Sequence, residues 1–160
     1  MTVTLFSVMR RVALVAFPVQ LGLRARQHSE ALLREFAIIA MGGGEGADVP
    51  KRLLEIAAES DERYARTTRA THDAIDLAAA NGCATVDFEL ELPERIASDT
   101  AETVNVLLEV DQYCGSGELL TLAPPPDIKL FWMWFLGELV RQVSGMQPTS
   151  WPEFSRRFDL

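Results

Sequence analysis

The stretch that decides the fold is IKLFWMWFLGELVRQV, residues 128–143, which carries two of the three tryptophans. Pro124 to Pro126 precede it, and a proline in the first turn of a helix sacrifices no hydrogen bond. At about 100° per residue, apolar side chains fall on both sides of the predicted helix. One stripe holds Ile128, Phe131, Trp132, Phe135, Leu139, Val143 and Met146, and the other side holds Leu130, Met133, Trp134, Gly137 and Val140. Such a helix must be covered on both sides.

Charge argues against a membrane span and against nucleic acid as a partner. Lys129, Glu138 and Arg141 interrupt the apolar helix, and its apolar run is shorter than the ~20 residues that cross a bilayer. The chain has 15 Lys and Arg against 23 Asp and Glu, a net charge of −8. Because phosphates and anionic lipids are bound by basic patches, we expect neither nucleic acid nor a membrane as a partner.

The cysteines and the N-terminal segment indicate a reducing compartment. Cys83 and Cys114 are too few for a disulfide framework and do not form a CxxC pair. Arg10 and Arg11 precede an apolar run, as in some export signals, but Pro18 interrupts the run and no small-residue cleavage site follows it. We therefore expect a cytoplasmic protein.

Hydrophobic periodicity divides the rest of the chain into strands and helices. Residues 12–17 are apolar on both faces and predict a strand, and residues 21–41 follow the helical period. The glycine-rich segment 42–46 lacks the Lys-Ser/Thr ending of a phosphate-binding loop, which favours a flexible connector. A long helix is expected from Asp48 to Asn81-Gly82, with a bend near Ser60 and Asp61. Residues 93–114 predict a further helix that ends at Gly115.

The segment 84–92 is the clearest strand, because its apolar and polar residues alternate as on a sheet with one dry and one wet face. The dry side holds Ala84, Val86, Phe88, Leu90 and Leu92, and the wet side holds Thr85, Asp87, Glu89 and Glu91. The order strand-helix-helix-strand-helix-helix cannot form a doubly wound sheet. We predict an α+β fold that is predominantly helical, with about four helices packed with a small two-stranded sheet.

The length of 160 residues predicts a single domain over residues 1–160. Residues 145–160 form its tail. Trp151, Phe154 and Phe158 give this tail enough aromatic surface that we expect it to pack back on the domain.

The sequence contains no recognisable catalytic or metal-binding motif. His28, His72, Cys83 and Cys114 lack the spacings that pre-arrange metal ligands, so we expect no metal and no cofactor. The carboxylates of segment 84–92 lie on its wet side, whereas acid–base work requires a carboxyl group whose pKa is shifted by burial. The serines occur without a Gly-x-Ser-x-Gly turn, and no base can be assigned to them.

Glu138 and Arg141 are the polar pair of interest on the helix 128–143. Charged residues within an apolar helix are either paired or directed at a partner. Asp111 and Tyr113, near the end of the preceding helix, are the candidates to approach them. We interpret the two as an ion pair at the rim of the core, worth about 0.3–0.5 kcal/mol, in preference to a functional pair.

The chain resembles a family of small bacterial proteins. The resemblance rests on LLTLAPPP at 119–126, WFLGELVRQ at 134–142 and PTSWP at 148–152, and FPV at 17–19 with LLREF at 32–36 extends it over most of the chain. Members accompany ATP-binding anti-sigma kinases and their antagonist domains in signalling gene clusters, which implies a regulatory role. Because this chain lacks the Asp-x-Gly-x-Gly turn of such kinases, the resemblance implies a partner of the kinase, and it supplies no catalytic residues.

Two functions stay open. The first is a non-enzymatic regulatory or protein-interaction protein, and the second is a small-molecule-binding or enzymatic domain with a pocket near the tryptophan-rich helix. We favour the first because every catalytic signal is weak. One stripe of the helix 128–143 suffices to seat it on its own domain, so a second copy in a homodimer is the simplest cover for the other side. The candidate interaction residues are Leu130, Met133, Trp134, Gly137, Glu138, Val140 and Arg141.

Overall fold

The computed structural model describes residues 7–43, 48–115 and 124–159 of the chain. The elements of this part are β1 (Met9–Pro18), α1 (Val19–Gly42), α2 (Asp48–Ala80), β2 (Thr85–Pro93), α3 (Ile96–Gly115), α4 (Pro126–Val143), α5 (Trp151–Ser155) and the 3₁₀ turn η1 (Arg156–Phe158). The predominantly helical α+β fold is thus confirmed, and α5 and η1 are additions that the sequence did not predict. None of the described helices is long and apolar enough to cross a membrane.

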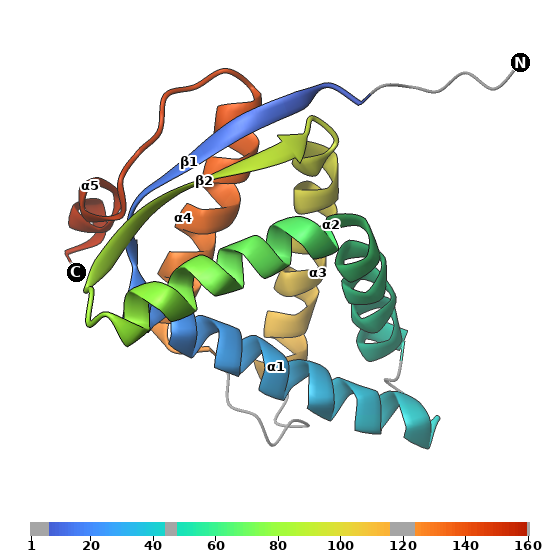
Figure 1. Ribbon diagram of the computed structural model, residues 1–160. Coiled ribbons are helices and arrows are strands. Elements are labelled where there is room, and N and C mark those ends of the chain that lie inside the picture. The colour runs from blue at the N-terminus through green and yellow to red at the C-terminus, as the bar shows by residue number, and fades with distance from the viewer. Residues whose placement is uncertain (1–6, 44–47, 116–123, 160) are drawn as a thin grey trace, which may run out of the picture.

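The helix α4 lies in the middle of the fold (Figure 1). The two strands form an antiparallel ribbon, and α4 packs against β1 on one face of it while α2 packs against β2. The helices α1, α3 and α5 each contact α4 as well. The cover that the two-sided apolar pattern required therefore comes largely from within the same chain.

The strand β2 alternates as predicted, except that Ala84, expected on the dry side, is exposed and precedes the strand. Leu90 and Leu92 are buried, whereas Glu89 and Glu91 are exposed on the opposite face. In the antiparallel register Leu90 lies opposite Val12 of β1, which is also buried. The ribbon thus has one dry face turned to the helices and one wet face, and the dry face positions the site described below.

A bulge in β1 was not predicted, and it places Phe17 in the core. Leu14 pairs with Phe88 and Phe17 pairs with Val86, so two residues of β1 face a single residue of β2. Ala16, the second of the two, has a φ of 52°, which is uncommon for a residue with a side chain. Its N–H donates to Oδ1 of Asp87 at 2.6 Å. The carboxylate therefore supports the bulge.

Phe17 is the centre of an aromatic cluster. Its ring centroid lies 5.3 Å from those of Phe88 and Phe131, in a tilted and an edge-to-face arrangement respectively. Trp134 and Phe135 of α4 complete the cluster at 6.1 and 6.4 Å. These spacings are in the range that aromatic pairs prefer, so the ring of Phe17 joins the sheet to α4.

The long helix α2 is bent, as predicted, but the bend lies at a different residue. Tyr64 has φ −113° and ψ 16°, which are outside the helical range, whereas the sequence placed the bend near Ser60 and Asp61. Figure 1 shows the two halves of α2 running in different directions. The side chain of Tyr64 is buried and reaches α3, which explains the position of the bend.

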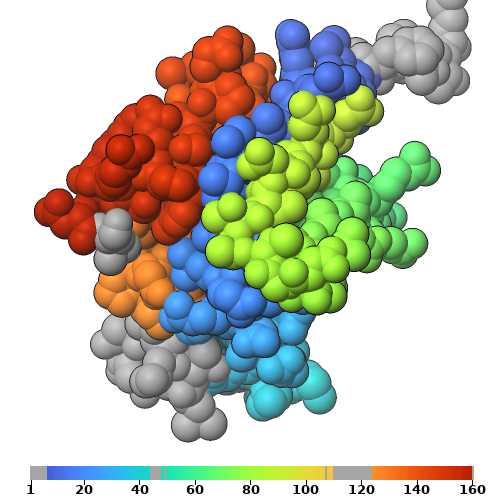
Figure 2. Space-filling model, turned by 60° about the vertical axis from the view of Figure 1, so that its left-hand side comes forward, coloured from blue at the N-terminus to red at the C-terminus, as the bar shows by residue number. Residues whose placement is uncertain are grey.

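The C-terminal residues lie against β1 and α4 (Figure 2). The indole Nε1 of Trp134 donates to the carbonyl oxygen of Thr149 at 2.8 Å, and the rings of Trp134 and Trp151 are 5.7 Å apart.

Met146, expected on the inward stripe of the helix 128–143, is instead exposed. The reason is that α4 ends at Val143 and that Gly145, with a φ of 93°, turns the chain. Residues 119–122 and most of the glycine-rich connector lie outside the described residues.

A first prediction concerns Gly22 on α1. A Cβ atom at this position would lie 2.4 Å from Cε1 of Phe17, whose ring is held by four other aromatic rings. Gly22→Ala should therefore lower the free energy of unfolding by about 1–3 kcal/mol, as overpacking of a core does. Gly42→Ala is the control, because its added methyl group meets nothing within 4 Å. Equal stability of the two variants in denaturant titrations would contradict this packing.

Candidate functional site

Glu138 is a buried carboxylate at the C-terminal half of α4, with 2% of the residue exposed. Oε1 accepts a hydrogen bond from Nη1 of Arg141. Oε2 accepts from Nε2 of Gln142 at 2.7 Å and from the backbone N–H of Thr149 at 3.0 Å. The expected ion pair between Glu138 and Arg141 is therefore confirmed. Its expected place at the rim of the core is wrong for Glu138, which is buried, with three donors that satisfy its charge.

Gln142 continues this buried network to the sheet. Its Oε1 accepts from the backbone N–H of Ala13 at 2.8 Å, and its Nε2 donates to the backbone carbonyl of Ala13 at 2.8 Å. The side chain amide therefore occupies the position of a neighbouring strand on the free edge of β1. The network fixes α4, β1 and the C-terminal residues to one another, so Glu138 and Arg141 have a structural role here.

The predicted interaction residues divide into two groups. Trp134, with 1% of its surface exposed, and Leu130 are buried within the chain, so the expectation that they need cover from outside is wrong. The cover of Trp134 comes from the C-terminal residues around Trp151. Met133 is 58% exposed, and Gly137 and Val140 are half-buried beside it. Asp111 and Tyr113 have side chains outside the described part of the chain.

Met133, Gly137, Val140 and Arg141 line an apolar hollow between α3 and α4, here called the α3–α4 groove, with a volume of about 640 Å³. The opposite wall includes Val104 and Leu108, and Leu108 is 60% exposed. Val104 is also exposed, whereas Val106, two residues further along α3, is buried. The groove thus joins part of the predicted face to residues of α3 that were not predicted.

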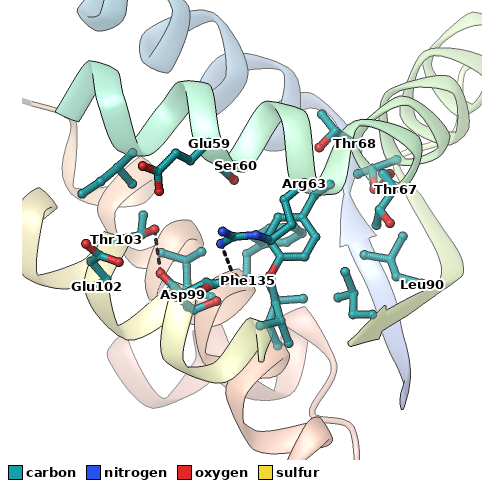
Figure 3. Close-up of a pocket in the computed structure, with 18 of the residues that line it drawn as sticks. Glu59, Ser60, Arg63, Thr67, Thr68, Leu90, Asp99, Glu102, Thr103 and Phe135 are labelled. Carbon is teal, nitrogen blue, oxygen red and sulfur yellow. Dashed lines mark hydrogen bonds and ion pairs between the residues drawn. The ribbon is translucent and has the colours of Figure 1, made fainter. Parts of the chain in front are cut away.

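A second hollow, the α2–α3 cavity, lies on the other side of α3 and has a volume of about 290 Å³ (Figure 3). Its floor is apolar and comes from β2 and α4, with Leu90, Leu92, Phe135 and Leu139. Its walls are polar and come from α2 and α3. This is a pocket near the tryptophan-rich helix, although no tryptophan lines it.

Asp99 of α3 organises one wall of the α2–α3 cavity. Nη1 of Arg63 donates to its Oδ2 at 2.9 Å, the hydroxyl of Tyr64 donates to the same oxygen, and Nε of Arg95 lies 3.4 Å away. Burial raises the pKa of Asp99, but the hydrogen bonds from Tyr64 and Arg63 outweigh it and hold the pKa below its usual value. Burial and the hydrogen bond to Asp99 raise the pKa of Tyr64 to about 12.

The cluster on Asp99 favours binding over catalysis. A tyrosine whose pKa is raised stays protonated, and a carboxyl group whose pKa is lowered is a weak base, so neither is poised for proton transfer near neutral pH. Ser60 and His72 also line the cavity, but no hydrogen bond joins them within the described structure.

The histidines and cysteines do not come together. His28 lies on α1 with its ring 6.0 Å from that of Trp132, and burial lowers its pKa. His72 lies on α2 and Cys83 is exposed, while the side chain of Cys114 is outside the described part. Among the described residues, no three His, Cys, Asp or Glu side chains are grouped so as to hold a metal ion.

Sequence reasoning missed the residues that build the α2–α3 cavity. Tyr64 was visible as an isolated aromatic residue in the polar middle of α2, which is a usable signal for a buried contact. Asp99 and Thr100 carried no such signal, because a polar residue on an amphipathic helix is most often solvated. The contact of Asp99 with Tyr64 depends on the bend of α2.

Neither protein-family models, nor curated proteins, nor solved structures gave a match to this chain.

A second prediction concerns the ionisation of Tyr64. In Tyr113→Phe, Tyr64 is the single tyrosine, and its ultraviolet absorbance should titrate with a midpoint of about 12. The neutral phenol is favoured in the fold, so its contribution to stability is full below pH ~10 and is lost as the pH rises through about 12. Asp99→Asn in the same background should move the midpoint down towards 10. A midpoint near 10 in folded Tyr113→Phe, verified by circular dichroism, would contradict the Tyr64–Asp99 hydrogen bond.

Proposed function

We propose that the chain is a non-enzymatic, cytoplasmic regulatory protein that acts through protein–protein contacts, with the α3–α4 groove as its interface. The observation that carries this proposal is the exposure of Met133 and Leu108 on the two walls of one apolar groove. Single exposed apolar residues are ordinary, but adjoining ones that line a shared hollow are typical of interaction sites. Arg141 and Lys129 lie at its polar margin.

The first occupant of the groove that we propose is a second copy of the chain. Two copies of a chain with net charge −8 repel each other unless the acidic charge lies away from the meeting surfaces. The charged residues that line the groove, Lys129 and Arg141 of α4, are both basic, so the acidic net charge of the chain is not concentrated at this surface. A twofold axis across the groove sets α4 of one copy against α3 of the other, which covers the apolar residue Met133 of one copy with Leu108 of the other.

The resemblance described above supplies the regulatory setting. It supports a role beside an ATP-binding anti-sigma kinase, with this chain as a binding partner of the kinase. Arg24 and Arg26 are both engaged with acidic residues, Asp127 and Asp76. These arginines are therefore poor candidates for binding phosphates. The apolar groove is the better candidate for an interface, and it suits a protein surface.

The third prediction tests the groove as a dimer interface. Met133→Glu places a charge on an exposed residue of the groove and should convert a micromolar dimer into a monomer without loss of the fold. Leu77→Glu is the matched control, because Leu77 is a comparably exposed apolar residue on α2, outside the groove. Light scattering gives the mass of each, and circular dichroism verifies the fold.

Three outcomes of this experiment bear on the proposal. A dimeric wild type and Leu77→Glu with a monomeric Met133→Glu support it. A wild type that is monomeric at micromolar concentration refutes the homodimer, and a dimer that Met133→Glu leaves intact refutes the groove as its interface. Titration of a purified anti-sigma-type kinase from the same cells tests the regulatory role, which fails if neither the wild type nor Met133→Glu binds.

A further inference from the structure

We propose that the N-terminal segment of the chain, residues 1–6, docks in the α3–α4 groove of the same molecule. The docking itself does not depend on the dimer proposed above, whereas its regulatory effect, competition with a second copy for the groove, rests on that dimer. Three features carry the inference, which are the apolar side chains left open in the groove, the point at which the segment leaves the sheet, and the pattern of its side chains.

The α3–α4 groove leaves large apolar side chains uncovered by the described part of the chain. Val104 and Leu108 on the α3 wall are exposed, and so is Met133 on the α4 wall. Gly137 lies on the same wall as Met133, and a Cβ atom added to it would meet nothing within 4 Å, so the groove is open down to the backbone of α4. A hollow of about 640 Å³ with such walls favours an apolar occupant.

The segment leaves the sheet beside the first turn of α3. The backbone carbonyl of Val8 accepts from the N–H of Glu94 at 3.0 Å, and α3 begins two residues later at Ile96. Nε of Arg10 donates to Oε1 of the same Glu94 at 2.8 Å, which fixes this end of β1 to the start of the helix. Figure 1 shows the start of β1 and the start of α3 at the same end of the molecule. Residues 1–6 are therefore attached close to one end of the groove.

The segment is long enough to run along the groove. The residues of α3 that line the groove are, in order from its start, Thr100, Ala101, Val104, Asn105 and Leu108. Leu108 is the farthest of them and lies about 18 Å along the helix axis from Ile96, at about 1.5 Å per residue. Residues 1–7 in an extended conformation span up to about 23 Å. The groove of the same molecule is thus within reach.

The side chains of the segment suit an apolar groove. Residues 1–6 lie outside the described residues, and their sequence, MTVTLF, contains no charged side chain. In an extended conformation, Met1, Val3 and Leu5 point to one side, and Thr2 and Thr4 point to the other. The apolar side can face the groove while the threonines face water. Because the segment carries no acidic side chain, the net charge of −8 does not oppose its docking.

Docking within one molecule places the segment in competition with a second copy. A segment tethered near its site has an effective concentration in the millimolar range, whereas a second copy is present at micromolar concentration. Three apolar side chains in an open groove bind weakly, so the docked segment reduces the affinity of the proposed dimer without abolishing it. The N-terminal segment is then a regulator of the interface.

The fourth prediction locates the segment by NMR. A nitroxide spin label is attached to Thr4→Cys, on the threonine side of the segment, in a chain whose Cys83 and Cys114 are replaced by alanine. Because paramagnetic broadening falls steeply with distance, the label should broaden the amide signals of Leu108 and Met133 in the groove. The amide signal of Leu77, on α2 outside the groove, should stay sharp.

A matched pair of substitutions tests which side of the segment docks. Leu5→Asp puts a carboxylate on the apolar side and should remove the broadening, because an unpaired charge is disfavoured in an apolar groove. Thr2→Asp adds the same charge on the opposite side and should leave the broadening intact. In light scattering, Leu5→Asp should also strengthen the proposed dimer about two- to tenfold, and Thr2→Asp should not. Circular dichroism verifies the fold of both variants.

Contrary results overturn the inference. Absence of broadening in the groove, or equal broadening in Leu5→Asp and Thr2→Asp, refutes docking through the apolar side. Broadening that appears only when spin-labelled chains are mixed with isotopically enriched, unlabelled chains places the segment in the groove of a second copy and refutes docking within one molecule.

The same measurements separate this inference from the proposed function. Broadening of the groove in a chain that stays monomeric retains the docking and refutes the dimer. A dimer without broadening retains the dimer and refutes the docking. Broadening together with equal dimer affinities of Leu5→Asp and Thr2→Asp refutes the competition between the segment and a second copy.

Discussion

The fold depends on the hydrogen bonds between the side chain of Gln142 and the backbone of Ala13. The free edge of β1 presents an N–H and a carbonyl group that no strand satisfies, and a two-stranded ribbon is marginal by itself. Gln142 satisfies both groups at 2.8 Å and also donates to Glu138. One amide thus holds α4 against the sheet and fixes the carboxylate that accepts from Thr149, so the sheet, α4 and the C-terminal residues form a single polar network.

The pattern of apolar residues predicted the fold class but not the surface. The sequence of 128–143 required cover on both sides, which the chain provides except around the exposed Met133. The alternation of 84–92 required one dry face, which Leu90 and Leu92 form. The pattern does not reveal which residues cover the helix 128–143. Trp134 was assigned to an interface because the contact with Trp151 and Thr149 depends on a turn at Gly145 that periodicity does not reveal.

The bulge of β1 and the bend of α2 were beyond sequence reasoning for a related reason. Ala16 is not a residue that favours a positive φ, so nothing in its identity marks the bulge. Its stability comes from the Asp87 carboxylate on the neighbouring strand. The bend at Tyr64 is likewise tied to Asp99 on another helix. Both features depend on contacts between residues far apart in the chain, which local patterns do not encode.

The helix α3 separates two different hollows. The α3–α4 groove is lined mainly by apolar side chains, whereas the α2–α3 cavity has hydroxyl and carboxyl groups on its walls, and Thr100 borders both. The two sides of α3 thus differ in chemistry, since the hollow towards α4 is mainly apolar and the hollow towards α2 is polar on its walls.

The measurement that tests the role of the Gln142–Ala13 contact most directly is the free energy of unfolding of Gln142→Leu, with Gln27→Leu as the control. Leucine keeps the volume of the side chain but leaves the N–H and carbonyl of Ala13 unpaired, and Gln27 is an exposed residue of α1. We expect a loss of about 2–4 kcal/mol for Gln142→Leu and accelerated hydrogen exchange at the Ala13 amide, because two partly buried backbone groups and the Glu138 carboxylate each lose a partner. A loss no larger than that of the control, with the Ala13 amide still protected, would contradict it.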